Sequence, residues 1–231
     1  MSINQQPVVL LGGFLSQQGN YSALKHAISD LSGNNVWVVD TRFFDWIPCI
    51  SKVGWLIVLN KLDTTIKNAS STTNKKVILI GHSQGGILAR LYLSPEPFMG
   101  KRFAGLESVN QLITLGSPHI NHAGLNRGGH MSRWIEEKIP GSAFAPQICY
   151  KSVAGRYIQG RPKGSLHERF AFSIYKDICR DGEVWGDGIV PVTSALLPGS
   201  QQVTLNGVSH YSLIGDPWYG SKQVLPLWWE S

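Results

Sequence analysis

Residues 76–86 read KVILIGHSQGG, and this stretch decides the fold. Residues 77–80 form an apolar run with the length and composition of a buried β-strand. Residues 84–93 are typical of a helix. The glycines on either side of Ser83 predict a sharp turn between the two, because a side chain at those positions would meet the neighbouring strand or helix. We therefore predict a strand, a tight turn that carries Ser83, and a helix.

Apolar runs and amphipathic segments alternate along the rest of the chain. The predicted strands cover residues 8–11, 36–39, 112–115 and 203–205, and the predicted helices cover 21–31, 54–66 and 223–229. Near-continuous apolar strands that alternate with helices are typical of a mostly parallel sheet with helices on both faces. Ligands bind such sheets beyond the carboxyl ends of the strands, so the residues after each strand are the candidates for a site.

Length and composition predict one α/β domain over residues 1–231. The chain has 231 residues, of which 42% are hydrophobic and 16% are charged, and this excludes a disordered chain and a coiled coil. No uncharged run reaches the ~18 apolar residues of a membrane span. The first residues lack the basic segment of a secretory signal. We expect a cytoplasmic protein.

The three cysteines form no CxxC pair. They stand at positions 49, 149 and 179. An odd and sparse set of cysteines favours free thiols in a reducing compartment over a single disulfide.

Most of the net charge of +6 lies in residues 151–180, which contain seven Lys and Arg and only two acidic residues, Glu168 and Asp177. The simplest interpretation of this segment is a solvated loop region. The alternative is a surface that makes peripheral contact with an anionic membrane or an acidic substrate. We expect no nucleic-acid partner, because no nucleic-acid-binding motif accompanies the charge.

Ser83 is the candidate nucleophile. A GxSxG pentapeptide between an apolar strand and a helix is the nucleophile elbow, whose strained turn exposes the serine hydroxyl over the sheet edge. The helix that begins at Gln84 points free N–H groups at the same place and favours negative charge there. The competing interpretation is a tight turn with a capping serine.

A serine nucleophile needs a base and an acid, which follow it along the chain in this arrangement. Asp187 lies in the glycine-flanked turn GDGIVP, and His210 lies in the loop after the strand at 203–205. We predict that His210 accepts the serine proton and that Asp187 orients the imidazole. The other acids weighed for this role are Asp177, Asp181, Glu183 and Asp216.

Two backbone N–H groups complete the predicted site. The oxyanion of an acyl-transfer intermediate is stabilised by the residue after the nucleophile and by the loop after the first strand. These positions are Gln84 and Phe14. Gly12-Gly13 could instead be only a flexible strand end. A phosphate-binding loop is excluded by the missing GxxxxGK[ST] motif.

Residues 120–147 have two interpretations. Their amphipathic piece, residues 131–139, packs on the core or forms a small lid over the serine. His119, His122 and His130 suggest a metal site only weakly, since no carboxylate partner accompanies them. We predict no metal and no cofactor.

Four segments together resemble the α/β-hydrolase superfamily, most closely its lipase branch and the GPI inositol-deacylase relatives. The segments are VVLLGGF, VILIGHSQGG, LITLGSPHINHAG, and GDGIVP followed by GVSH. The lipase pattern has His-Gly where this chain has Gly12-Gly13. The resemblance spans residues 7–210 and implies the hydrolysis of carboxylic esters without a cofactor. We also predict that Gly13, His82 and His119 lie near the substrate, with His82 as a structural or pocket-lining residue and not the base.

We therefore expect a serine esterase that acts on lipid or other apolar acyl esters. Acyl transfer to an alcohol or thiol would use the same nucleophile with a different acceptor. A third alternative is a non-catalytic protein that uses the pocket as a receptor. The sequence fixes neither the acyl chain nor the oligomeric state.

Overall fold

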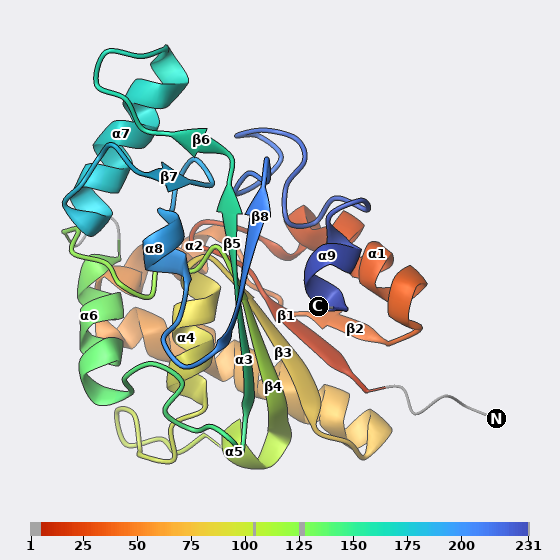
Figure 1. Cartoon of the computed structure of the whole chain (residues 1–231). Helices are drawn as coiled ribbons and strands as arrows, with labels where there is room; N and C mark the ends of the chain where they lie inside the picture. The colour runs from red at the N-terminus through yellow and green to blue at the C-terminus, as the bar shows by residue number, and fades with distance from the viewer. Residues whose placement is uncertain (1–5, 104, 125–127, 231) are drawn as a thin grey trace.

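A six-stranded, fully parallel sheet forms the centre of the protein, and the computed structural model describes residues 6–103, 105–124 and 128–230. The strands run in the order β2-β1-β3-β4-β5-β8 (Figure 1). They are β1 (Val8–Leu11), β2 (Val36–Val38), β3 (Val77–His82), β4 (Val109–Leu115), β5 (Cys149–Arg156) and β8 (Gln201–Asn206). A separate antiparallel pair joins β6 (Ile158–Gln159) to β7 (Trp185–Gly186).

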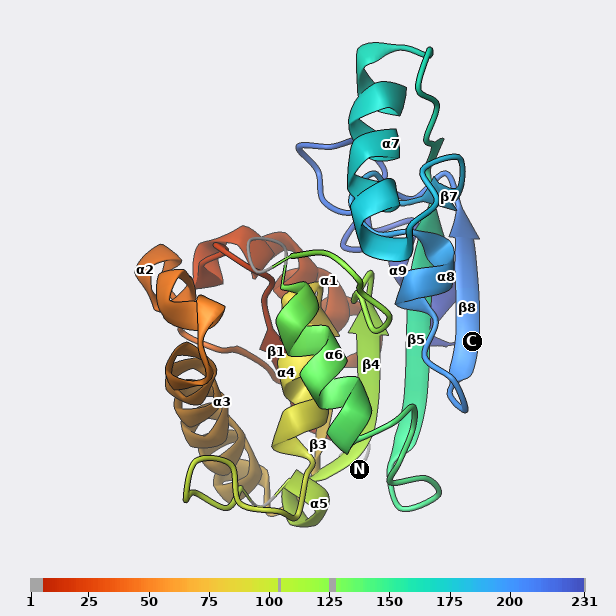
Figure 2. The ribbon, with the colours of Figure 1, turned by 90° about the vertical axis from the view of Figure 1, so that its left-hand side faces the viewer.

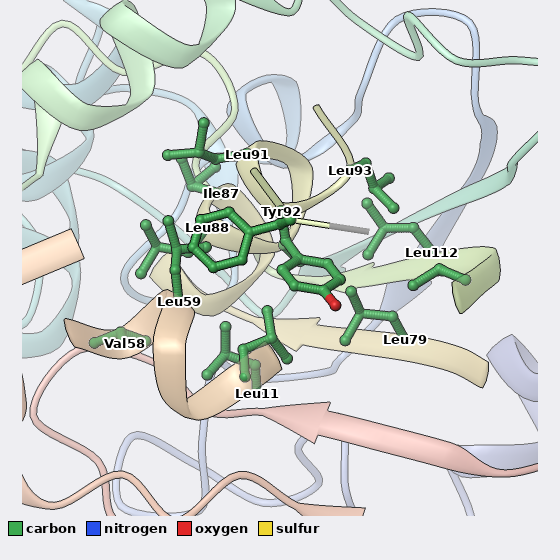
Figure 3. Close-up of a cluster of buried hydrophobic side chains, with 14 of the residues drawn as sticks. Leu11, Val58, Leu59, Leu79, Ile87, Leu88, Leu91, Tyr92, Leu93 and Leu112 are labelled. Atoms are coloured by element: carbon green, nitrogen blue, oxygen red, sulfur yellow. The ribbon is translucent and has the colours of Figure 1, made fainter. Parts of the chain in front are cut away.

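Helices cover both faces of the sheet because side chains alternate along each buried strand. Val9 and Leu11 of β1 face one core cluster, and Val8 and Leu10 face the other. The first cluster includes side chains of α3 (Lys52–Thr73), α4 (Gln84–Tyr92) and α6 (Gly129–Lys138). Figure 3 shows its centre, where Tyr92 lies over the strands. The second cluster includes side chains of α1 (Ser22–Ser32) and α9 (Leu225–Trp229).

The remaining helices are short, apart from α7. They are α2 (Phe43–Trp46), α5 (Gly105–Ser108), α7 (Leu166–Cys179), α8 (Val192–Ala195) and the 3₁₀ turns η1 (Gln18–Tyr21) and η2 (Ile47–Ile50). Figure 2 shows α7 standing beyond the carboxyl end of β5. Within the described ranges, no helix has the length and apolar character needed to cross a bilayer.

The predicted mostly parallel sheet with helices on both faces is confirmed, and each predicted strand lies within or overlaps an observed one. The predicted helices are also present, although α3 extends to Thr73. It ends at Asn74, whose φ of 53° is left-handed, a conformation that asparagine tolerates better than most residues.

The interpretation of residues 151–180 as a loop region is wrong. The segment contains most of β5 and all of α7. Lys151 lies in β5 and is only 4% exposed, and its Nζ donates to the backbone oxygen of Trp228 at 3.0 Å. The basic residues therefore do not form one surface, because the chain buries the first of them between the sheet and α9.

Helix α6 lies within the segment considered as a lid. Its Met131 and Ile135 are buried in the first cluster, and Glu136 pairs at 2.7 Å with the buried Arg90 of α4. Residues 125–127 of the same segment lie outside the described residues. The lid over residues 120–147 stays a prediction.

Helix α4 approaches the end of β1 closely at Gly85. A Cβ atom at this position would collide with the carbonyl oxygens of Gly12 and Leu11. These are backbone atoms, which cannot rotate away as a side chain could. Only glycine therefore allows α4 to start directly behind the turn at Ser83.

We predict that Gly85→Ala lowers the free energy of unfolding by about 2 kcal/mol, because overpacking strains the β1–α4 contact. Gly19→Ala is the matched control, since a Cβ there meets nothing within 4 Å, and it should stay within about 0.5 kcal/mol. Urea denaturation measures both. Equal stabilities for the two variants would contradict the close approach.

Candidate active site

Ser83 occupies the turn between β3 and α4. Its φ is 54° and its ψ is −129°, a conformation that costs a non-glycine residue about 1–3 kcal/mol. Its N–H donates to the Leu115 carbonyl of β4 at 2.9 Å, which ties the turn to the next strand. A Cβ on Gly81 would collide with backbone atoms of Gly86, so the chain can fold back here only because residue 81 is a glycine. The predicted strand–turn–helix is present.

Asp187 is fully buried, and four hydrogen bonds satisfy its carboxylate. Oδ1 accepts from the backbone N–H groups of Ile189 at 3.0 Å and Val190 at 2.7 Å. Oδ2 accepts from His210 Nδ1 at 2.7 Å and from the Tyr219 hydroxyl at 2.8 Å. These four bonds offset the cost of burying a polar side chain.

The other acids weighed for this role lie at the surface. Asp177, Asp181, Glu183 and Asp216 are all exposed. The structure pairs His210 with Asp187 and with none of these four among the described residues.

His210 is 3% exposed and is held at two points by Asp187. Its backbone N–H donates to the Asp187 carbonyl at 2.8 Å, and its Nδ1 faces the carboxylate. A proton on Nδ1 leaves the lone pair on Nε2 free to act as a base. Among the described residues no hydrogen bond joins Nε2 to the Ser83 hydroxyl, and such bonds are often long in unliganded proteins.

Ser83 and His210 line one cavity of about 550 Å³, a size typical of small-molecule sites. Its mouth carries both apolar and polar side chains. The lining residues are Gly13, Phe14, Leu15, Ser16, Asn20, Tyr21, His82, Ser83, His210, Tyr211, Ser212, Leu213 and Trp218. The cavity thus has room for an ester with an apolar part and a polar part.

The loop after β1 reaches the nucleophile. A Cβ on Gly13 would lie 2.8 Å from the Cβ of Ser83, so the backbone passes directly over the serine. The Gly13 N–H already donates to the Tyr21 hydroxyl at 2.8 Å. The next amide along the loop belongs to Phe14, and Gln84 opens α4 with an N–H that has no partner one turn earlier in that helix.

His82 and His119 occupy different places. His82 lines the cavity, and its ring centroid lies 4.7 Å from that of His210. Burial, followed by the nearby His210, lowers the pKa of His82 to about 3. His119 is not a lining residue: it is buried between Thr114, at 3.0 Å, and Arg90, at 3.4 Å. The structure does not bring His119 to the cavity.

His122 and His130, the other two histidines considered for a metal site, belong to no metal-binding cluster among the described residues. Within the described ranges, no group of three or more His, Cys, Asp or Glu side chains could hold a metal ion. The ring of His130 packs against Trp55, with centroids 5.4 Å apart.

Two buried tyrosines of the site, Tyr21 and Tyr219, belong to no sequence motif. Tyr219 is fully buried, accepts from the Gly155 N–H at 2.6 Å and donates to Asp187. Tyr21 lies between Gly13 and His82. Each tyrosine is distant in sequence from at least one of its partners, so no local motif marks either of them.

Comparisons with known proteins identify the family of the chain. A family model described as the PGAP1-like alpha/beta domain matches residues 3–132. A GPI inositol-deacylase of Kluyveromyces lactis is 37% identical over 67 residues, which are 29% of this chain and only 6% of that protein. This chain therefore matches a small part of that relative's length.

Solved structures show the fold. The mature lipase BlEst2 of Bacillus licheniformis superposes with a TM-score of 0.65 at 17% identity, over 94% of this chain and 90% of that chain. A putative thioesterase of Silicibacter sp. superposes with a TM-score of 0.52 at 14% identity, over 96% and 76%. The chain has the α/β-hydrolase fold.

We predict that this site makes the protein acid-labile. Because the pKa of His82 falls to about 3 on folding from about 6.5 in an unfolded chain, the unfolded state binds an extra proton between these values. The free energy of unfolding therefore decreases as the pH falls below about 6.5, with a loss of about 2 kcal/mol by pH 5.

Urea denaturation at pH 7 and pH 5 measures this loss. The His82→Gln variant is the control, because glutamine stays neutral throughout. The native protein should lose about 2 kcal/mol more than the variant. Equal losses would mean that His82 is protonated in the folded protein.

Proposed function

Since the chain belongs to the PGAP1-like alpha/beta domain family, we propose that it is a serine hydrolase that cleaves carboxylic esters. One observation carries the proposal: the buried Asp187–His210 pair, at 2.7 Å, opens on the same cavity as Ser83 in its left-handed turn. A strained serine beside a base that a carboxylate orients is the arrangement that activates a hydroxyl. The ester-cleaving names of the similar proteins also support it.

In the proposed reaction, Ser83 Oγ attacks the ester carbonyl while His210 Nε2 takes its proton. Asp187 keeps Nδ1 protonated and stabilises the imidazolium. The carbonyl oxygen becomes negative and is stabilised by the N–H groups of Phe14 and Gln84, each worth about 2.7–4 kcal/mol.

His210 then returns the proton to the departing alcohol, and Ser83 carries the acyl group as an ester. Water, activated by the same imidazole, attacks this acyl-enzyme and releases the acid. If an alcohol or thiol took the place of water, the same chemistry would transfer the acyl group.

The cavity supports a lipid or other apolar acyl ester as substrate. Phe14 and Leu15 are each 38% exposed and Leu213 is 89% exposed, and all three line the cavity. Exposed apolar side chains at a cavity mouth favour an apolar ligand segment. The polar lining, including Ser16 and Asn20, favours a hydrogen-bonding group elsewhere on the same substrate.

The tip of α7 supports contact with an anionic membrane surface as part of this proposal. Leu166 is 80% exposed and Phe170 is 53% exposed, and Arg161, Lys163 and Arg169 are exposed around them. Apolar side chains among basic ones suit the interface of an anionic bilayer. The helix stands clear of the sheet (Figure 2), so the tip can reach a flat surface.

We predict that Ser83→Ala lowers the hydrolysis of a short p-nitrophenyl ester by at least about 1,000-fold, because no other group replaces the nucleophile. Ser71→Ala, an exposed serine on α3, is the control and should keep full activity. Circular dichroism checks that both variants fold. Undiminished turnover by Ser83→Ala would refute the proposed function.

We predict that the protein is retained on vesicles of phosphatidylcholine and phosphatidylglycerol. Salt at about 0.5 M should weaken this retention, because it screens the attraction between the basic side chains and the anionic lipid. Arg169→Gln should weaken it more than Lys222→Gln, an equal loss of charge at an exposed site outside α7. Vesicle sedimentation measures all three proteins. Equal retention on purely zwitterionic vesicles would contradict the membrane contact.

A further inference from the structure

A chain of three buried hydrogen bonds connects the loop after β1 to the loop that carries His210. The Gly13 N–H donates to the Tyr21 hydroxyl at 2.8 Å, and this hydroxyl lies 2.8 Å from His82 Nδ1. On the far side of the ring, His82 Nε2 lies 3.0 Å from the His210 carbonyl oxygen. Tyr21 and His82 are each 4% exposed. The side chains of Tyr21 and His82 have no role in the proposed reaction.

The donor and the acceptor of each of these three hydrogen bonds follow from the chemistry of the groups. A carbonyl oxygen only accepts, so His82 Nε2 carries a proton and donates it to His210. The buried His82 ring is neutral, since burial and the neighbouring His210 lower its pKa to about 3, and Nδ1 therefore has a lone pair. The Tyr21 hydroxyl donates to this lone pair, while its oxygen accepts from Gly13.

The packing around Gly12 fixes the tyrosine. A Cβ at position 12 would collide with the Tyr21 ring and with Ser16 Oγ. Ser16 Oγ in turn donates to the Gly13 carbonyl at 2.6 Å. The Tyr21 ring thus fills the space beside the loop that a side chain at position 12 would otherwise take, and both polar groups of the Gly13 backbone are bonded.

The two ends of this hydrogen-bond chain reach two parts of the proposed active site that must stay aligned. At one end, Gly13 precedes Phe14, whose N–H is the proposed oxyanion donor. At the other end, the bonded carbonyl belongs to His210, the proposed base. Ser83 follows His82 directly in sequence, so the bridging ring moves with the nucleophile.

We propose that Tyr21 and His82 are positioning residues, which together hold the oxyanion loop and the His210 backbone in register about Ser83. This inference rests on the proposed function. Neither side chain takes a proton from the substrate or attacks it. Because a misplacement of about 1 Å can cost about 100-fold in rate, loss of the chain should slow the chemical step and leave substrate binding nearly intact.

The first test is Tyr21→Phe, which removes the hydroxyl and keeps the ring that fills the space beside Gly12. The kcat for p-nitrophenyl ester hydrolysis should fall about 10- to 100-fold, and KM should change less than about 3-fold. Tyr92→Phe is the matched control, because it also removes a buried hydroxyl, one that bonds Asp63 at 3.2 Å outside the cavity. It should keep the native kcat.

The second test asks whether Tyr21 and His82 act together as parts of one hydrogen-bond chain. His82→Gln keeps a donor and an acceptor and should retain at least about ten times the kcat of His82→Leu, which keeps neither. Adding Tyr21→Phe to His82→Leu should lower kcat by less than about 3-fold further, since the chain is already broken. If the kcat loss of the double variant equals the product of the losses of the two single variants, the residues act independently and the inference is overturned.

The third test reads the hydrogen bonds directly and does not depend on activity. Nitrogen-15 NMR of the histidine rings should find His82 as the Nε2–H tautomer between pH 5 and 8, and Tyr21→Phe should shift only its Nδ1 signal strongly. The titratable groups that face His82 are Tyr21, Asp187, His210 and Tyr219. An Nδ1–H tautomer would overturn the inference.

The outcomes separate the two proposals. A native kcat in Tyr21→Phe, with Ser83→Ala inactive, overturns the positioning role and leaves the hydrolase standing. An active Ser83→Ala overturns the hydrolase and the positioning role with it. The NMR result still decides whether the hydrogen-bond chain exists.

Discussion

The turn at Ser83, with its φ of 54°, depends on how closely α4 can approach the strands beside it. Gly81 and Gly86 touch within the turn, and Gly85 lies against the carbonyl oxygens at the end of β1. These contacts leave the serine at the edge of the sheet. Its backbone conformation is one that a residue other than glycine adopts only when the surrounding structure imposes it. The cavity, the proposed base and the proposed oxyanion loop are all arranged around this one point.

Polar groups buried at the edge of a parallel sheet need complete hydrogen bonding, because each unsatisfied one would destabilise the fold. Asp187 meets this need with two backbone amides, a histidine and a tyrosine. His82 meets it with Tyr21 and the His210 carbonyl. The same bonds that satisfy these groups also restrict their rotamers, so stabilising the fold and aligning the proposed site are one physical task here.

The sheet and the serine turn were predictable because their signals are local: apolar runs of strand length and glycines at fixed spacing. Strand β5 was not predicted because its sequence, CYKSVAGR, is not a continuous apolar run. Its Lys151 is buried and donates to the Trp228 carbonyl, where a buried strand usually has an apolar side chain. Helix α7 had a local signal, the capping box between Ser165 and Glu168. Tyr21 and Tyr219 had none, since each reaches its partners only through the folded sheet.

The most direct measurement is a crystal structure of the protein after reaction with an alkyl phosphonate, which mimics the tetrahedral intermediate. The account predicts phosphorus bonded to Ser83 Oγ, with the phosphoryl oxygen about 3 Å from the Phe14 and Gln84 nitrogens. The imidazole of His210 should lie beside Oγ. An adduct on another residue, or a phosphoryl oxygen that points away from both amides, would contradict it.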